Sequence, residues 1–210
     1  MRVRFGNSFT ALEVAILAVT LLLVGCYMAA AGHLTKHMLL HIGLMAVLAP
    51  LAAMVWLSWG RPVASVKSSG FLAMATVVQL GLFFLWHSPR VLTWLMESHG
   101  MMAVAQGSLF IVATAFWLSV LQHAGNHVWR AIVALLLTGK LFCLLALLLV
   151  FAPRALYAGH DYGEPELVDQ QLAGLLMITA CPMTYILAAV LLVVRWLRTM
   201  EEDGKAESAA

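Results

Sequence analysis

Long runs of apolar residues, separated by short polar segments, make up most of the chain between residues 9 and 196. An α-helix needs about 20 consecutive apolar residues to cross the hydrocarbon core of a bilayer. Six runs have or approach this length, and each predicts a membrane span: Phe9–Ala31, Leu34–Trp59, Phe71–Trp86, Met101–Leu121, Val128–Phe151 and Leu172–Trp196. The third run ends at His87-Ser88-Pro89 because proline disfavours helix at the residue before it. Residues 90–100 predict a short helix on the membrane interface.

The composition agrees with lipid as the solvent. Of the 210 residues, 63% are hydrophobic and only 10% are charged, whereas soluble domains carry about 25% charged residues. The predicted fold class is therefore all-α, a polytopic transmembrane helical bundle of about six spans. Residues 1–200 form its single domain, and the polar residues 201–210 are predicted to be a disordered cytoplasmic tail. The net charge of +2, without a long basic run, argues against a nucleic-acid partner.

Lysine and arginine set the expected orientation, because these residues gather in cytoplasmic loops. With the N-terminus inside, eight fall on the cytoplasmic side: Arg2, Arg4, Arg61, Lys67, Arg130, Arg195, Arg198 and Lys205. Three fall outside: Lys36, Arg90 and Arg154. We therefore expect a multi-pass membrane protein with both termini cytoplasmic.

This orientation places most of the histidines near the external face. His33, His37 and His41 are spaced four residues apart at the start of the second span. Each step of four turns a helix by about 400°, so the three rings form one stripe. His87 ends the third span and His99 opens the fourth at the same face. Polar rings at membrane depth are functional by default.

Two kinds of cofactor suit this cluster. Imidazole from these five histidines, with thioether from Met38 and Met45 beside the stripe, favours copper, since thioether prefers the cuprous ion. The alternative is a haem b held between two histidines, as in an electron-transfer subunit. A haem pair must come from opposing helices, so the same-face triplet favours a small metal. A third possibility is a structural subunit whose histidines contact lipid headgroups or a partner.

Four segments together carry a family resemblance: His37-Met38-Leu39-Leu40-His41 with Ala49-Pro50-Leu51, Leu85-Trp86-His87-Ser88-Pro89, Phe116-Trp117, and Asp169-Gln170-Gln171-Leu172-Ala173-Gly174. In this order and at these intervals the sequence resembles the CtaG-type cytochrome c oxidase assembly factors, the polytopic bacterial family linked to caa-type oxidases. The resemblance implies a non-enzymatic assembly role for a haem–copper oxidase, with copper bound or delivered at the outer face. Its implied partners are oxidase subunits or other assembly factors. Relatives usually carry a second histidine near the position of Gln106, and many have a seventh span.

Among the histidines we expect His37, His41 and His87 to form the core of the metal site, with His33 and His99 as outer ligands. Asp169 lies at the outer end of the last span. Two roles suit it equally: orienting a ligand histidine through its second ring proton, or capping the last helix.

Lys140, near the middle of the fifth span, needs a partner because a charge is costly there. Glu13, in the inner part of the first span, is the candidate that the sequence offers.

Overall fold

The computed structural model describes residues 32–60, 66, 68–124, 127–157 and 164–208, with positions 22, 25, 26, 28 and 29. Regular structure in these ranges is helical: α2 (His33–Ile42), the π-helical segment η1 (Gly43–Leu48), α3 (Ala49–Ser58), α4 (Ser69–Trp86), α5 (Pro89–Met96), α6 (His99–Gln122), α7 (Val128–Phe151) and α8 (Glu164–Ser208). The all-α prediction is confirmed.

Five of the six predicted spans lie in the described ranges. Helices of spanning length and hydropathy run over His33–Ser58, Ser69–Trp86, His99–Gln122, Val128–Phe151 and Glu166–Glu202. The first four begin and end within two residues of the predicted limits. The first predicted span, Phe9–Ala31, lies almost entirely outside the described residues.

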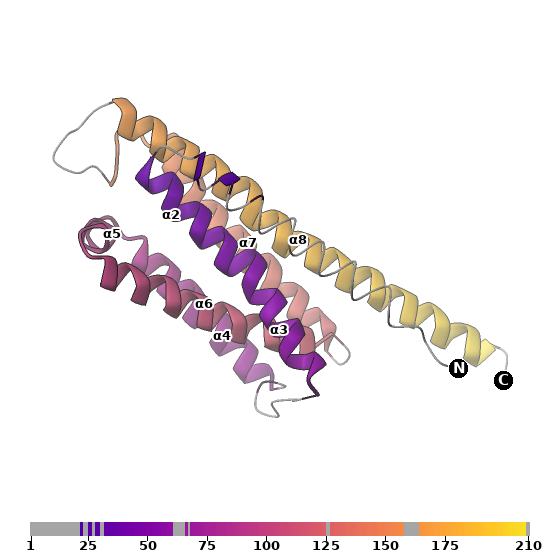
Figure 1. Ribbon diagram of the computed structural model, residues 1–210. Helices are drawn as coiled ribbons and strands as arrows, with labels where there is room; N and C mark the ends of the chain where they lie inside the picture. The colour runs from indigo at the N-terminus through magenta and orange to yellow at the C-terminus, as the bar shows by residue number, and fades with distance from the viewer. Residues whose placement is uncertain are drawn as a thin grey trace.

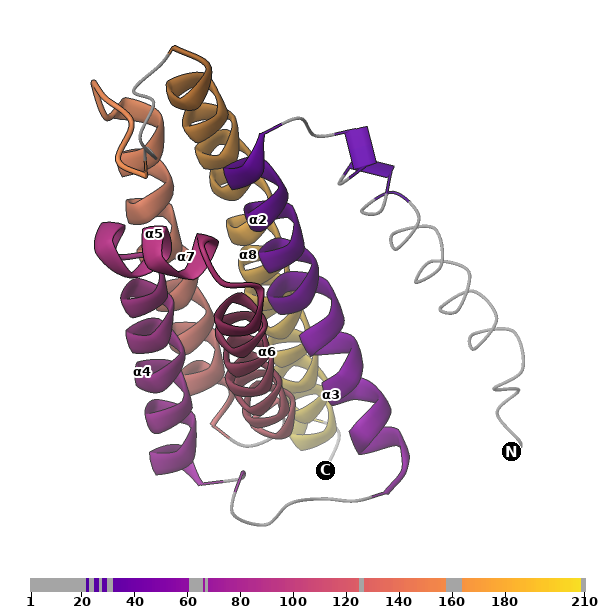
Figure 2. The same ribbon diagram turned by 60° about the vertical axis from the view of Figure 1, so that its left-hand side comes forward.

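The spans pack side by side into one bundle (Figure 1). Helix α7 packs along α8, the continuous α2–η1–α3 span contacts both α8 and α6, and α4 contacts α6 and α7. The short helix α5 lies across one end of the bundle, where α4 ends and α6 begins (Figure 2). We call this the α5 end; it also holds the start of α2. The predicted interfacial helix is thus present, over Pro89–Met96.

The helix starts follow from local capping chemistry. The Ser68 hydroxyl accepts a hydrogen bond from the Phe71 amide at 3.1 Å at the start of α4, and Ser98 plays the same part for α6 with Met101 at 3.5 Å. These serines satisfy N–H groups that a helix leaves free in its first turn. Helix α5 begins with Pro89, which has no N–H to satisfy.

A π-helical segment interrupts the second span. Gly43–Leu48 winds more widely than an α-helix. Such a segment holds one extra residue relative to an α-helix, and it leaves backbone carbonyls free to accept hydrogen bonds from other groups. The Met45 carbonyl accepts a hydrogen bond of 3.3 Å from the indole Nε1 of Trp117 on α6. Trp117 therefore joins α6 to the irregular part of the span.

Helices α7 and α8 approach each other closely at Gly174. A Cβ built there would lie 2.8 Å from Val150 Cγ2, 2.9 Å from Leu149 Cβ and 3.0 Å from the Ala146 carbonyl oxygen. One turn earlier, the Gln170 amide bonds to the end of α7: its Oε1 accepts from the Leu156 amide at 2.6 Å, and its Nε2 donates to Leu149 O at 3.2 Å. These contacts join the last two spans at the α5 end.

Helix α8 continues beyond the last apolar residues to Ser208. This differs from the disordered tail that the composition predicts for residues 201–210. Glu201 and Lys205 stand one turn apart and form an exposed ion pair of 2.9 Å, a spacing that supports helix. The assignment of residues 1–200 to a single domain stays a prediction.

Replacing Gly174 with alanine should weaken the α7–α8 contact, since the new methyl group meets backbone as well as side chains. We expect a loss of about 1–3 kcal/mol, typical of overpacking, read as a lower melting temperature in detergent. Gly107→Ala is the matched control, because its Cβ would meet nothing within 4 Å. An unchanged melting temperature for Gly174→Ala would contradict the close contact.

Candidate metal centre

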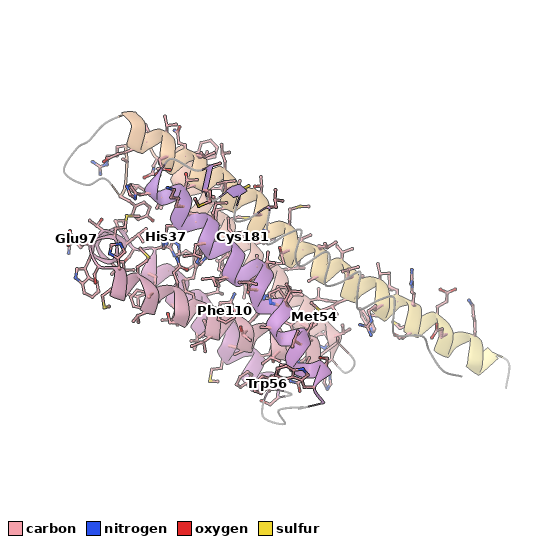
Figure 3. All side chains as sticks on the ribbon, in the orientation of Figure 1. His37, Met54, Trp56, Glu97, Phe110 and Cys181 are labelled. Atoms are coloured by element: carbon pink, nitrogen blue, oxygen red, sulfur yellow. The ribbon has the colours of Figure 1, made fainter. Side chains whose placement is uncertain are left out.

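Three histidines from two helices lie together at the α5 end. His37 and His41 stand one turn apart on α2, and His87 caps the C-terminus of α4. Ring centroids are 6.4 Å apart for His37 and His41, 5.7 Å for His37 and His87, and 5.0 Å for His41 and His87. Figure 3 labels His37 on α2 toward α5, well away from Trp56 at the other end of the span. These are the three residues predicted to form the core of the site, and we call them the histidine triad.

The tautomer of His87 follows from its hydrogen bond. Nδ1 lies 2.7 Å from the Phe83 carbonyl oxygen, and because a carbonyl only accepts, Nδ1 carries the proton. The lone pair therefore sits on Nε2, which is buried and has no hydrogen-bond partner. Burial lowers the pKa of His87, the first residue after the α4 span, from 6.5 to about 4 despite the bond to Phe83. A neutral imidazole fixed in this way is the usual form of a histidine ligand.

Tyr157 holds His87 from the other side. Its hydroxyl donates a 2.7 Å hydrogen bond to the His87 carbonyl oxygen. Burial raises the pKa of Tyr157 to about 12, so the hydroxyl keeps its proton and remains a donor. The segment after α7 thus helps to fix the backbone of a triad residue 70 positions earlier.

His41 is the most isolated member of the triad. It is fully buried, and neither ring nitrogen has a hydrogen-bond partner. The ring packs on Phe83 at a centroid distance of 5.4 Å, and Phe83 in turn packs on Phe142 at 4.2 Å. A buried polar atom without a partner costs about 1–3 kcal/mol. Unbonded nitrogens on an aromatic floor are therefore a costly arrangement that needs a compensating role.

Gln106 on α6 also lies against the triad. Its amide Nε2 lies 3.1 Å from Nδ1 of His37, while its Oε1 is buried without a partner. The amide also approaches His41 without making a hydrogen bond within 3.5 Å. Position 106, near which relatives usually carry a histidine, thus lies beside two of the three rings.

The triad is not a formed coordination sphere. Within the described residues, no three His, Cys, Asp or Glu side chains converge as a metal site. Rings that share one metal at nitrogen distances of 2.0–2.1 Å have centroids roughly 5 Å apart, a spacing that His41 and His87 already have at 5.0 Å. His37 lies further off, so its ring and the Gln106 amide would have to turn for three nitrogens to converge.

A groove of about 230 Å³ opens beside the triad at the α5 end. His33 and His99, both exposed, line it together with His37, Met96 and Met102. The two outer histidines predicted from the sequence therefore share one groove with the outermost triad residue. Met96 and Met102 were not predicted as site residues, although each lies three positions from His99, one before it and one after it.

The two methionines predicted as ligands lie elsewhere. Met38 and Met45 are buried in the hydrophobic core, with exposed fractions of 0% and 2%. On α2, Met38 follows His37 by one residue and so points about 100° away from it. Their role as copper ligands stays a prediction.

Comparison with known families decides the identity of the chain. Residues 7–199 match the family described as cytochrome c oxidase caa3 assembly factor. The chain belongs to this family. Neither the curated proteins nor the solved structures contain a match. The resemblance predicted from the four sequence segments is confirmed, and this caa3 assembly factor has a role in cytochrome c oxidase assembly as a multi-pass membrane protein.

Asp169 of the assembly factor bonds to the start of α2, and its predicted role in orienting a ligand histidine stays a prediction. It lies inside α8, so it does not cap that helix; instead its carboxylate caps α2 from across the bundle. Oδ2 accepts from the Leu34 amide at 2.9 Å and Oδ1 from the Thr35 amide at 3.1 Å, and the Thr35 hydroxyl also donates to Oδ1. Gly32 makes room, because a Cβ there would lie 1.7 Å from Oδ1.

The contacts of Asp169 in the described residues include no histidine ring. The carboxylate thus acts on the triad through the helix that carries His37 and His41, by fixing the start of α2. Its negative charge at a helix N-terminus is favourable on electrostatic grounds as well.

The predicted contact between Lys140 and Glu13 lies outside the described residues, because Glu13 is not among them. Lys140 itself is described, at the middle of α7, and is exposed.

Asp169→Ala should lower the melting temperature of the assembly factor by an amount that corresponds to about 1–2 kcal/mol, the upper range for loss of a cap. Asp169→Asn should fall between the parent and the alanine variant, since an amide oxygen replaces only one of the two accepting oxygens. Differential scanning fluorimetry in detergent measures the order. Equal stability of all three proteins would show that the cap does not hold α2.

Proposed function

We propose that the protein binds copper as the cuprous ion at the histidine triad and delivers it to the oxidase during assembly. The observation that carries this proposal is the concentration of unbonded polar atoms at the triad. Of the ten buried side-chain nitrogen and oxygen atoms without a partner in the described residues, four belong to His41, His87 and Gln106. Neutral imidazole nitrogen is the commonest side-chain ligand for metal ions, so unbonded nitrogens on neighbouring helices suit a metal ion.

The charge of the surroundings favours a monovalent ion. The triad and Gln106 are neutral, and Asp169, the carboxylate nearest to the start of α2, is already bonded to the amides of that helix. A divalent ion would bring two uncompensated charges into a region of low dielectric, where each is costly. Cu⁺ carries one charge and suits imidazole and thioether ligands.

The groove at the α5 end offers a route to the triad. Exposed His33 and His99 stand at its mouth, and His37 belongs to both the groove and the triad. Met96 and Met102 add thioether, which selects Cu⁺. In this scheme copper is cargo: it passes from the groove residues to His37 and then to His41 and His87.

Haem is less well supported. The rings of His41 and His87 meet nearly edge to face, at an interplanar angle of 73° and 5.0 Å between centroids. A porphyrin between them would require the rings to separate and Phe83 to leave its place against His87, where their centroids are 4.4 Å apart. A purely structural subunit would leave the cost of the unbonded nitrogens unexplained.

We infer a location in the bacterial plasma (inner) membrane from the family resemblance. The distribution of lysine and arginine supports an orientation with both termini cytoplasmic and the α5 end external. The groove would then open toward the side from which copper is supplied. The partners are oxidase subunits or other assembly factors, and the protein acts without turnover chemistry.

Copper content tests the proposal directly. Detergent-purified protein reconstituted with Cu⁺ should hold about one copper per chain, and His41→Ala/His87→Ala should lose it, since two buried nitrogen ligands disappear. Elemental analysis measures copper, and an absorption spectrum without a Soret band excludes haem.

His123→Ala is the matched control, because His123 is also buried, and its Nδ1 also bonds a carbonyl four residues earlier, that of Ser119. It should keep its copper. Equal copper content in the parent and in the double variant, with both proteins folded, would overturn the proposal.

Gln106→His should raise the affinity for Cu⁺ about tenfold or more, because it places a further imidazole against His37 and His41 where an amide now stands. Competition with a chromophoric Cu⁺ chelator measures this change. Gln106→Leu is the control, which should bind no more tightly than the parent. Unchanged affinity for the histidine variant would mean that position 106 does not face the metal.

A further inference from the structure

One charged residue interrupts an apolar stripe along the outward side of α7. The exposed residues of this helix recur every three or four positions, as expected for one helical face. Eight of the nine are apolar: Trp129, Val133, Leu136, Leu137, Leu144, Leu147, Leu148 and Phe151. The ninth is Lys140, also exposed.

Lys140 cannot reach water along its own helix. It lies 12 residues after Val128 and 11 before Phe151, which places it about 16–18 Å from either end. The side chain extends roughly 6 Å, so it snorkels to the interface only from near a helix end. No partner for its ammonium group occurs among the described residues. A lysine at this depth on a lipid-facing stripe is costly, and an acidic partner would stabilise it.

The surface around Lys140 suits a helix as that partner. The three-or-four spacing of the stripe is the pattern of a helix–helix seam. Val133 and Leu137 of the stripe also line a groove of about 360 Å³ between α7 and α4, with Val77 on the opposite wall. A second apolar helix would lie along this surface with its own side chains in the groove.

Two occupants from this chain fit poorly. A symmetric pair of copies meeting through this stripe would bring two lysines together, which is unfavourable in lipid. Glu13 is the only acid between residues 9 and 31. It lies four residues from the inner end of the predicted first span, whereas Lys140 lies 12 residues from the corresponding end of α7, an offset of about 12 Å in depth.

We infer that the α7 stripe centred on Lys140 is a docking surface for a transmembrane helix of the oxidase under assembly, one that presents an aspartate or glutamate at mid-membrane depth. The identity of the partner rests on the proposed assembly function. The ammonium–carboxylate pair sets the depth and register of the two helices, and the apolar residues on both sides supply the packing. The surface is separate from the histidine triad.

Photocrosslinking in membranes tests the inference. A benzoylphenylalanine in place of Leu144, one turn from Lys140, is introduced into the full chain, which is coexpressed with the caa3-type oxidase subunits of its own host. After irradiation, mass spectrometry should find the crosslink in an oxidase segment with an Asp or Glu within one turn of the crosslinked residue. Crosslinks to lipid alone, to residues 9–31 of this chain, or to a second copy would overturn the inference.

Charge variants test whether the crosslink depends on the ion pair or only on the proximity of the two helices. Lys140→Met should lower the crosslink yield about tenfold, the loss expected for one intramembrane polar contact, while Lys140→Arg keeps most of it. Lys205→Met is the control, because Lys205 pairs with Glu201 near the chain end, and it should leave the yield unchanged. Lys140→Glu should abolish the crosslink, and lysine in place of the partner's acid should restore it. An unchanged yield for Lys140→Met overturns the inference.

Copper content distinguishes this inference from the proposed function. Lys140→Met should bind as much Cu⁺ as the parent, because Lys140 is exposed on α7, whereas the triad lies on α2 and at the end of α4. A variant that retains its copper but loses the crosslink supports the docking surface. Loss of both would mean that the variant disturbs the bundle as a whole and would overturn a role confined to docking.

Discussion

Lipid offers no hydrogen bonds, so each polar group within the bundle must find its partner in the protein. The polar contacts between the spans satisfy this requirement. Asp169 and Gln170, adjacent on α8, bond respectively to the start of α2 and to the end of α7. Deeper in the bundle, the Gln79 amide donates to the Tyr185 hydroxyl at 3.0 Å and joins α4 to α8. The spans are thus fastened by a few polar contacts within extensive apolar packing.

Because of this constraint, polar groups that have no partner within the described residues are informative. At the triad, imidazole nitrogens are buried without partners on a floor of Phe83 and Phe142. On α7, an ammonium group lies at mid-membrane depth on an apolar stripe. Both cost free energy in the isolated chain. Under the two proposals above, a metal ion would satisfy the imidazole nitrogens and a carboxylate of a partner helix would pair with the ammonium group.

The sequence predicts the spans and the grouping of the triad because both depend on periodicity. Apolar runs mark the helices, and the four-residue spacing puts His37 and His41 on one face. The proximity of His87 to these two histidines is predicted because the ends of neighbouring spans lie at the same depth in the membrane. The cap on α2 was not predictable, since the acceptor comes from Asp169, 135 residues away from Leu34. Sequence alone also could not show that Gln106 faces His37, or that Met96 and Met102 share a groove with His33. Such facts depend on how helices rotate about their axes when they pack.

The π-helical segment in the second span has an evolutionary consequence. A wide turn of this kind adds one residue to an otherwise regular helix, and one residue corresponds to about 100° of rotation. The half of the span that bears the imidazoles is therefore turned relative to the half that packs on α6 below it, where Trp117 holds the Met45 carbonyl. Relatives without that extra residue would direct the same histidine motif at a different neighbour. A single insertion of this kind can redirect a ligand set without altering any of its residues.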